Sequence, residues 1–350
     1  MSRYGVLIVD DSAFMRRAIH LLFDEDPDFY VVGIARNGAE AVEKVNRLKP
    51  DIVTMDVEMP EMDGIEALKI IMADHPVPVV MLSVQTDHGT EATIKALEHG
   101  AVDFFLKDHL IGGDGQAGEH KTFLERVKCV AQAKPSGIER QGRPAEIPSV
   151  ELASRRPAVD LILIGSSTGG PSALQSILLR FPATFPIPVL VVQHMPAGFT
   201  KPLADRFNNL CPITIKEAEN GEVPAPGNVY VAPAGFQTQV VRQKDGVVLL
   251  TVAGDTMGRY LYKPSIDAAL TSAVPVYGRR ILTVILTGMG TDGTAGCREL
   301  KKMKGRVLAE AEESCVVYGM PRSVHEAGLT DRQVPLHQIY ENLIDMAFEG

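Results

Sequence analysis

Short apolar runs alternate with segments of helical periodicity along most of this chain, and that alternation is what most constrains its fold. In the first third the apolar runs are residues 6–9, 31–35, 52–55, 79–82 and 103–106. Between them, apolar residues recur three or four positions apart, as at Met15, Ile19 and Leu22, which predicts helices with one buried face. Strands separated by helices favour a parallel sheet covered on both faces. We therefore expect residues 1–134 to form an α/β domain of five βα repeats.

The alternation is interrupted once and then resumes. Residues 135–157 are rich in Pro, Ser, Gly and charge and have no periodicity, which predicts a flexible linker. Beyond it, the expected strands are 161–165, 189–193, 213–217, 229–232 and 282–287, and the expected helices are 171–179 and 198–210. Residues 238–242 and 247–252 predict a β-hairpin. Residues 158–350 are thus predicted to form a second α/β domain, doubly wound, mostly parallel and Rossmann-like, with a hairpin.

Charge and composition exclude several classes of protein. The net charge is −9, but residues 1–110 hold 20 acidic and 10 basic residues, whereas residues 158–350 hold 18 and 17. Neither domain has a basic stripe, so we expect no nucleic acid partner. No apolar stretch approaches 18 residues and no signal-peptide core is present, so we expect no membrane insertion. The four cysteines lack paired short spacings, which indicates reduced thiols and a cytoplasmic protein.

Acidic, hydroxyl and basic side chains follow four strands of the first predicted sheet. Asp10 and Asp11 follow the first strand, Asp56 the third, Ser83 the fourth and Lys107 the fifth. Parallel strands bind ligands at their carboxyl ends, so these groups should meet there. Three carboxylates suit Mg²⁺, and a carboxylate beside that ion can attack a phosphoryl donor to form an acyl phosphate.

These positions and the segment DIVTMDVEMPEMDG at 51–64 resemble the receiver domain of two-component response regulators, which is flavodoxin-like, over residues 3–134. The resemblance implies that a histidine kinase is the phosphodonor and that Asp56 is phosphorylated. It also implies a Mg²⁺ site made by three carboxylates and one backbone carbonyl, those of Asp10, Asp11, Asp56 and Glu58.

The same resemblance assigns residues that respond to the phosphoryl group. Ser83 and Lys107 are implied to sense it, and Phe105 is implied to be the aromatic switch. The sequence departs from the family at Asp108, because Pro usually follows the lysine.

A serine motif follows the first strand of the second domain. Gly165–Gly169, GSSTG, fits G-x-S-x-G between an apolar strand and a helical segment. Such a strand-to-helix turn exposes its middle serine, here Ser167, as a nucleophile. Gly-rich turns also bind phosphate, so a nucleotide-binding loop is an alternative, although neither G-x-G-x-x-G nor G-x-x-x-x-G-K-[ST] occurs here.

A nucleophilic serine needs a base, and the second domain offers three histidines. His194 follows the strand at 189–193, at the same sheet edge as Ser167. His325 and His337 lie in a polar region and are expected at the surface. His194 is therefore the predicted base.

The base in turn needs a carboxylate to orient it. Asp292, in TGMGTDG at 287–293, follows an apolar strand and is the predicted acid, with Asp267 and Asp255 as alternatives. The glycines of this segment would let backbone N–H groups face a developing oxyanion.

Four segments carry a second resemblance, over residues 158–347. IGSSTGGPSAL, QHMPAGFT, ILTGMGTDGTAG and SCVVYGMPR resemble the catalytic domain of the chemotaxis protein-glutamate methylesterase family, and the domain order matches as well. The resemblance implies that Ser167 is the nucleophile, His194 the general base and Asp292 its partner. It further implies that the Met289 N–H is an oxyanion donor and that Thr168 positions the site.

The expected function is therefore that of a serine hydrolase activated by phosphorylation. It would hydrolyse γ-glutamyl methyl esters of methylated chemoreceptors, and also deamidate glutamines, with no cofactor for ester hydrolysis. The loop Tyr262–Ser265 departs from the family, which more often has His-Arg-Pro-Ser. Two alternatives are a receiver joined to a non-catalytic nucleotide-binding domain and a receiver joined to a receptor-docking module.

Overall fold

The computed structural model describes residues 3–111, 117–132, 155–255 and 258–348. The chain divides into two compact units, Met1–Arg140 and Gln141–Gly350, and each is described by itself. Most of the linker predicted at 135–157 lies outside the described residues, so the domain boundaries at 134 and 158 stay predictions. None of the helices in the described ranges is long and apolar enough to cross a membrane.

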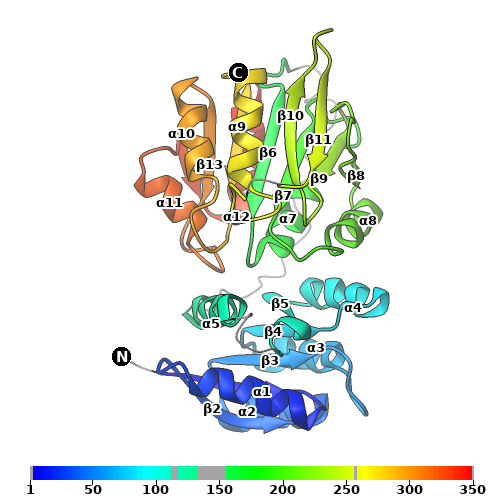
Figure 1. Cartoon of the computed structure of the whole chain (residues 1–350), viewed down its shortest axis with the longest axis vertical. Coiled ribbons are helices and arrows are strands. Elements are labelled where there is room, and N and C mark those ends of the chain that lie inside the picture. Colours follow the sequence, from blue (N-terminus) through cyan, green and yellow to red (C-terminus); the bar gives the residue numbers. More distant parts are fainter. Residues whose placement is uncertain (1–2, 112–116, 133–154, 256–257, 349–350) are drawn as a thin grey trace. The chain divides into compact units, whose positions relative to one another are not determined.

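The first unit contains a five-stranded parallel sheet in the order β2-β1-β3-β4-β5. Its strands are β1 (Tyr4–Val9), β2 (Phe29–Ala35), β3 (Ile52–Asp56), β4 (Val79–Ser83) and β5 (Asp103–Leu106). Its helices are α1 (Ala13–Asp24), α2 (Gly38–Leu48), α3 (Gly64–Asp74), α4 (Asp87–Glu98) and α5 (Ala117–Gln132), with a short 3₁₀ helix at Lys107–His109. Helices α1 and α5 contact each other, as do α2, α3 and α4 in series (Figure 1). The predicted five-stranded flavodoxin-like domain is confirmed.

The start of α3 is fixed against the end of β3. The Asp63 carboxylate accepts hydrogen bonds from the N–H groups of Ile65 and Glu66, both at 2.8 Å, which caps the helix. A Cβ at position 64 would lie 2.0 Å from the Asp56 carbonyl oxygen, so only glycine fits there. The Met-Asp-Gly sequence therefore brings the helix N-terminus directly against the Asp56 backbone.

The second unit contains a seven-stranded parallel sheet in the order β14-β13-β12-β6-β7-β9-β8 and an antiparallel hairpin, β10-β11. Its strands are β6 (Leu161–Ser166), β7 (Val189–Gln193), β8 (Thr214–Glu217), β9 (Asn228–Val231), β10 (Gln237–Arg242), β11 (Val248–Ala253), β12 (Ile281–Ile285), β13 (Arg306–Glu310) and β14 (Arg332–Val334). Its helices are α7 (Gly170–Leu178), α8 (Thr200–Leu210), α9 (Ile266–Tyr277), α10 (Thr294–Lys302), α11 (Met320–Glu326) and α12 (Leu336–Ala347).

The helices of this unit form two groups. Helix α7 contacts α8 and α12, whereas α10 contacts α9 and α11, and α9 also packs on the hairpin (Figure 1). Such a sheet with helices on both sides confirms the predicted doubly wound, Rossmann-like domain with a hairpin. Sequence periodicity did not single out α9–α12, β13 or β14, because several are short and α9 contains Pro275.

Candidate active site and acidic cluster

Ser167 lies in the tight turn between β6 and α7, where it is 7% exposed. The turn needs glycine on its helical side. Gly169 has a φ of +77°, and a Cβ at position 170 would lie 2.0 Å from Oε1 of Gln193. The G-x-S-x-G motif therefore builds the sharp strand-to-helix turn that was predicted from it.

Gln193, the last residue of β7, ties this turn to the neighbouring strand. Its Nε2 donates to the carbonyl oxygens of Ser167 and His194, both at 2.9 Å, and its Oε1 accepts a hydrogen bond from Ser166 at 2.6 Å. Sequence reasoning missed this residue. The available signal was an amide at the end of a buried strand, since such a group needs partners when it is buried.

His194 and Asp292 come together at this edge of the sheet. Nε2 of His194 lies 2.8 Å from Oδ2 of Asp292, and both side chains are nearly buried. Nδ1 of His194 is buried and has no hydrogen-bond partner in the described part of the chain. The carboxylate contact places the ring proton on Nε2, which leaves the Nδ1 lone pair available to accept a proton.

The Asp292 carboxylate sits at the N-terminus of α9. It accepts hydrogen bonds from the Ser265 hydroxyl at 2.9 Å and from the N–H groups of Ile266 and Asp267 at 2.7 and 3.0 Å. Burial acts to raise the pKa of Asp292, but the His194 imidazole and these backbone N–H groups outweigh burial, so the pKa is lowered. Asp292 is therefore ionised at neutral pH and can stabilise an imidazolium.

The two alternative acids have other contacts. Asp267 accepts a hydrogen bond from the Gly296 N–H at 2.6 Å, and Asp255 accepts one from the Tyr260 N–H at 3.3 Å. Burial raises the pKa of Asp267 to about 6, and the Asp292 charge adds to that effect. Of the three candidate acids, Asp292 is the one placed against His194. The other two histidines, His325 and His337, are exposed, as predicted.

The segment after β12 lies against the serine turn. The Thr287 carbonyl accepts a hydrogen bond from the Ser167 N–H at 3.0 Å, and the Thr287 hydroxyl donates to the Thr168 carbonyl at 3.0 Å. A Cβ at position 288 would lie 2.7 Å from the Ser167 Cβ. Met289, the predicted oxyanion donor, therefore follows a glycine that lies against the Ser167 turn.

The departing loop Tyr262–Ser265 lies against the histidine. The rings of Tyr262 and His194 are stacked with centroids 4.1 Å apart and an interplanar angle of 10°. Gln237 donates to the Tyr262 carbonyl at 2.7 Å, which fixes the loop to the start of β10. Tyr262 thus lines the site, a contact that the sequence could not reveal.

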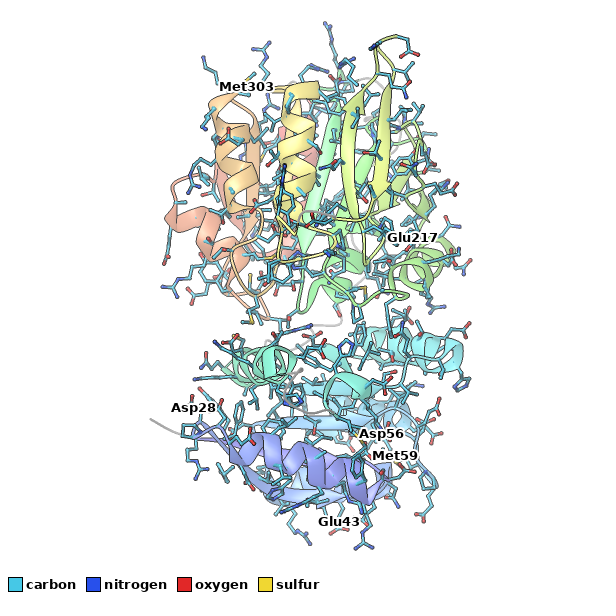
Figure 2. All side chains as sticks on the ribbon, viewed as in Figure 1. Asp28, Glu43, Asp56, Met59, Glu217 and Met303 are labelled. Atoms are coloured by element: carbon cyan, nitrogen blue, oxygen red, sulfur yellow. The ribbon has the colours of Figure 1, made fainter. Side chains whose placement is uncertain are left out.

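In the first unit, the predicted acidic residues converge. Ligand oxygens of Asp10, Asp11 and Asp56 lie within 4.8 Å of one another, and Asp56 is labelled in Figure 2. Nζ of Lys107 lies 2.8 Å from Asp10 and 2.7 Å from Asp56. Burial raises the pKa of Asp56 to about 6, although Lys107 opposes the shift. One ammonium does not balance three carboxylates, and hard oxygen donors with unbalanced charge fit a Mg²⁺ ion.

The remaining predicted receiver residues have separate contacts. The Ser83 hydroxyl accepts a hydrogen bond from Thr93 at 2.8 Å. Phe105 is buried, with its ring edge-on to Phe123 at 4.9 Å and the Arg126 guanidinium 4.4 Å from its centroid. The exposed Glu58 side chain pairs with His88 at 2.9 Å, so its predicted role rests on its backbone carbonyl alone.

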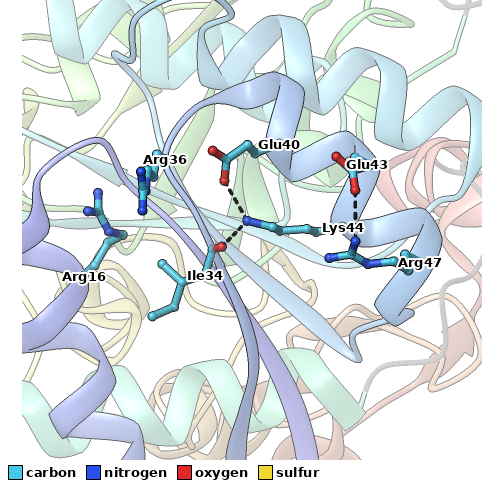
Figure 3. A pocket seen from close by; sticks show the side chains of 7 residues that line it. All are labelled: Arg16, Ile34, Arg36, Glu40, Glu43, Lys44 and Arg47. Atoms are coloured by element: carbon cyan, nitrogen blue, oxygen red, sulfur yellow. Dashed lines mark hydrogen bonds and ion pairs between the residues drawn. The ribbon is translucent and has the colours of Figure 1, made fainter.

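A hollow of about 630 Å³ lies beside α1, β2 and α2 in the same unit. It is lined by Arg16, Ile34, Arg36, Glu40, Glu43, Lys44 and Arg47 (Figure 3). Lys44 pairs with Glu40 at 2.6 Å and Arg47 with Glu43 at 3.1 Å, so much of its charge is already neutralised. It contains none of the predicted site residues.

Comparison with known proteins agrees with both halves of this arrangement. Residues 162–343 match the CheB methylesterase family and residues 6–111 match the response regulator receiver domain family. The chain belongs to the CheB methylesterase family. A Thermotoga maritima protein-glutamate methylesterase/protein-glutamine glutaminase is 43% identical over 97% of this chain and 98% of its own length. A Geobacillus kaustophilus protein of the same description is 43% identical over the full length of both.

A solved structure extends the likeness to the fold of the second unit. The crystal structure of the Thermotoga maritima CheB methylesterase catalytic domain covers 53% of this chain and 98% of its own, with a TM-score of 0.51 and 44% identity. The family membership and the two-domain α/β architecture predicted from the sequence are thereby confirmed.

Proposed function

We propose that this chain hydrolyses γ-glutamyl methyl esters, and deamidates glutamines, on methylated chemoreceptors. The observation that carries the proposal is the 2.8 Å contact between His194 and Asp292 at the sheet edge that also bears the Ser167 turn. Neither nucleotide binding nor receptor docking requires an imidazole that a carboxylate orients at the sheet edge of a serine turn. The names of the relatives, protein-glutamate methylesterase/protein-glutamine glutaminase, support the substrate class.

In the proposed mechanism Ser167 attacks the ester carbonyl and its proton passes to Nδ1 of His194. Asp292 stabilises the resulting imidazolium, and the Met289 N–H donates to the oxyanion while Thr168 helps to position the site. His194 then protonates the leaving methoxide, which departs as methanol and leaves an acyl-enzyme.

Water completes the reaction. His194 removes a proton from the water as it attacks the acyl-enzyme, and breakdown of the second tetrahedral intermediate releases the glutamate carboxylate and free Ser167. With glutamine as substrate the same steps release ammonia. These steps use side-chain and backbone groups alone, so we expect hydrolysis to need no cofactor.

We propose that phosphorylation of Asp56 by a chemotaxis histidine kinase activates this hydrolysis. Asp10, Asp11, Asp56 and the Glu58 carbonyl would hold Mg²⁺, which offsets the negative charge that collects during phosphoryl transfer. Lys107, already 2.7 Å from Asp56, would pair with the phosphoryl oxygens. Ser83 would exchange its contact with Thr93 for one with the phosphoryl group, and the region around Phe105 would repack. The unphosphorylated receiver would restrict access to Ser167 until this change occurs.

Methanol release from membranes bearing methylated receptors, with and without a phosphodonor, tests this function. We expect release by the whole chain to rise with the phosphodonor and to be lost in Ser167→Ala, which should still be phosphorylated at Asp56. Hydrolysis retained by Ser167→Ala would contradict the nucleophile assignment. Receptor binding without methanol release would favour a docking module, and thermal stabilisation by NAD without fluorophosphonate labelling of Ser167 would favour nucleotide binding.

A further inference from the structure

A fully buried glutamate lies behind the serine turn. Glu310 is the last residue of β13, where Val307, Leu308 and Ala309 are apolar, and its exposed fraction is 0%. Burial raises the pKa of Glu310 to about 7, although hydrogen bonds from Thr287, Ser314 and Cys315 oppose the shift. Burying an acid among apolar strands disfavours folding unless its oxygens are well bonded, so its contacts are informative.

One oxygen of this carboxylate binds the segment that follows β12. The Thr287 N–H donates to Oε2 of Glu310 at 2.8 Å, and the Ser314 hydroxyl donates to Oε1 at 2.9 Å. Glu310 is thereby the acceptor for the Thr287 N–H, two residues before Met289 in the segment that leads to Asp292.

Thr287 in turn bonds to both sides of the nucleophile. Its carbonyl accepts the Ser167 N–H at 3.0 Å, its hydroxyl donates to the Thr168 carbonyl at 3.0 Å, and the same hydroxyl accepts the Val317 N–H at 2.9 Å. The peptide on the amino side of Thr287 is fixed by Glu310 and the peptide on its carboxyl side by Ser167. A shift of Thr287 would therefore move the serine turn and the Gly288–Met289 peptide together.

We propose that Glu310 is a positioning residue for ester hydrolysis, which holds Thr287 and through it the nucleophilic turn and the oxyanion donor. This inference rests on the function proposed above for Ser167. Glu310 does not touch substrate, so its loss should act on the chemical step and leave substrate binding unchanged. Misplacement of reacting groups by a fraction of an ångström raises the barrier without changing contacts to distant parts of the substrate.

Glu310→Gln is the sharpest variant, because its amide oxygen can still accept from Thr287. Its NH₂ group would face Ser314, whose hydroxyl can turn toward the Ala311 carbonyl, now 3.3 Å away. The bond to Thr287 then loses its charge-assisted character but not its partner. We expect kcat to fall by about 5- to 20-fold while KM stays within about twofold.

Asp331→Asn provides a matched control in the same sheet. Asp331 accepts the Val307 N–H at 2.7 Å near the opposite end of β13 and pairs with Lys301 at 2.6 Å, so the variant makes the same carboxylate-to-amide change at the other end of the strand. We expect its kcat to equal that of the unaltered chain. A kcat for Glu310→Gln within about twofold of the unaltered chain, or an equal loss in Asp331→Asn, would overturn the inference.

The assay uses the whole chain with a phosphodonor, with kcat and KM from methanol release and the inactivation rate constant of Ser167 by a fluorophosphonate. Both rate constants should fall together. If Glu310→Gln does not fold, Ser314→Ala decides, because it removes a second hydrogen bond that holds the carboxylate. We expect about a 2- to 5-fold loss of kcat in Ser314→Ala, and an unchanged kcat would overturn the inference.

Ser167→Ala separates the two proposals. Activity in that variant would refute the proposed function. An inactive Ser167→Ala together with a fully active Glu310→Gln would refute only the role of Glu310.

Discussion

At the residue scale, His194 is constrained from two directions. Asp292 holds its Nε2 at 2.8 Å, and the Tyr262 ring lies parallel to the imidazole at 4.1 Å. The carboxylate selects the tautomer and the aromatic face restricts the plane of the ring. An aromatic face also attracts a cation, so Tyr262 should stabilise the imidazolium that the proposed mechanism forms on His194.

Replacing Tyr262 should therefore slow hydrolysis. In Tyr262→Leu, loss of the aromatic face should weaken the stabilisation of the imidazolium that forms during the proposed reaction and lower kcat by about 3-fold. Tyr262→Phe keeps the aromatic face and serves as the control, with kcat unchanged. The measurement is the rate of methanol release, and equal kcat values for the Leu and Phe variants would contradict the stacking argument.

Glu310 should affect the pH dependence of stability as well as the rate of hydrolysis. Its folded-state pKa of about 7 lies above its ordinary value of 4.5, so the native state binds more protons than the unfolded state between these values. Stability from this group is therefore highest at low pH and falls as pH rises from about 4.5 to 7, by up to roughly 3 kcal/mol. Glu310→Gln should lack this decline. Urea unfolding of both proteins at pH 5 and pH 8 measures it, and parallel changes in the two would contradict it.

At the element scale, the site depends on which strands are neighbours in the sheet. Apolar runs and the G-x-S-x-G motif were enough to predict β6, β7, β12 and the serine turn. The order β13-β12-β6-β7 could not be read from them, because strands that are distant in sequence are adjacent here. Gln193 and Glu310 were missed for a different reason: each bonds to the backbone at the end of the neighbouring strand, and the pattern of apolar residues does not show such lateral contacts. The role of the α9 N-terminus was missed because Pro275 obscured that helix.

Helix α9 begins beside the Asp292 carboxylate, and its N-capping residue, Ser265, bonds both to Asp292 and to the first turn of the helix. The Ser265 hydroxyl donates to Asp292 at 2.9 Å and accepts the Ala268 N–H at 3.2 Å. Ser265→Ala should therefore destabilise the second domain by about 1 kcal/mol and also lower kcat. Asp292→Asn should lower both stability and kcat further, since an amide cannot accept hydrogen bonds from all the donors around it. Its kcat should fall by about 10³- to 10⁴-fold.

Thermal unfolding and methanol release of the two variants provide the comparison. Ser272→Ala, in the middle of the same helix, is the control for a general effect on α9. Its hydroxyl accepts the Val240 N–H at 3.0 Å and has no contact with Asp292. A Ser265→Ala protein as active as Ser272→Ala would contradict the coupling between the helix cap and Asp292.

At the scale of the whole molecule, negative charge and catalysis belong to different units. Residues 1–110 carry 20 acidic and 10 basic residues, whereas residues 158–350 are nearly balanced at 18 and 17. Part of the first group is the cluster of Asp10, Asp11 and Asp56, where the raised pKa of Asp56 reflects burial beside like charges. The surplus of negative charge thus lies in the unit that holds the proposed phosphorylation site, whereas the unit that holds the proposed hydrolytic residues is nearly neutral.

Separating the units should release the catalytic domain from control. The crystal structure of the Thermotoga maritima catalytic domain covers 98% of its own chain and 53% of this one, so we expect residues 158–350 to fold alone. We expect this fragment to hydrolyse receptor methyl esters faster than the unphosphorylated whole chain, because the restriction proposed for the receiver is absent. The whole chain should approach the rate of the fragment with a phosphodonor, whereas Asp56→Asn should stay slow. Equal rates for the fragment and the unphosphorylated chain would contradict inhibition by the receiver. A fast Asp56→Asn protein would contradict the assignment of Asp56 as the site whose phosphorylation relieves that inhibition.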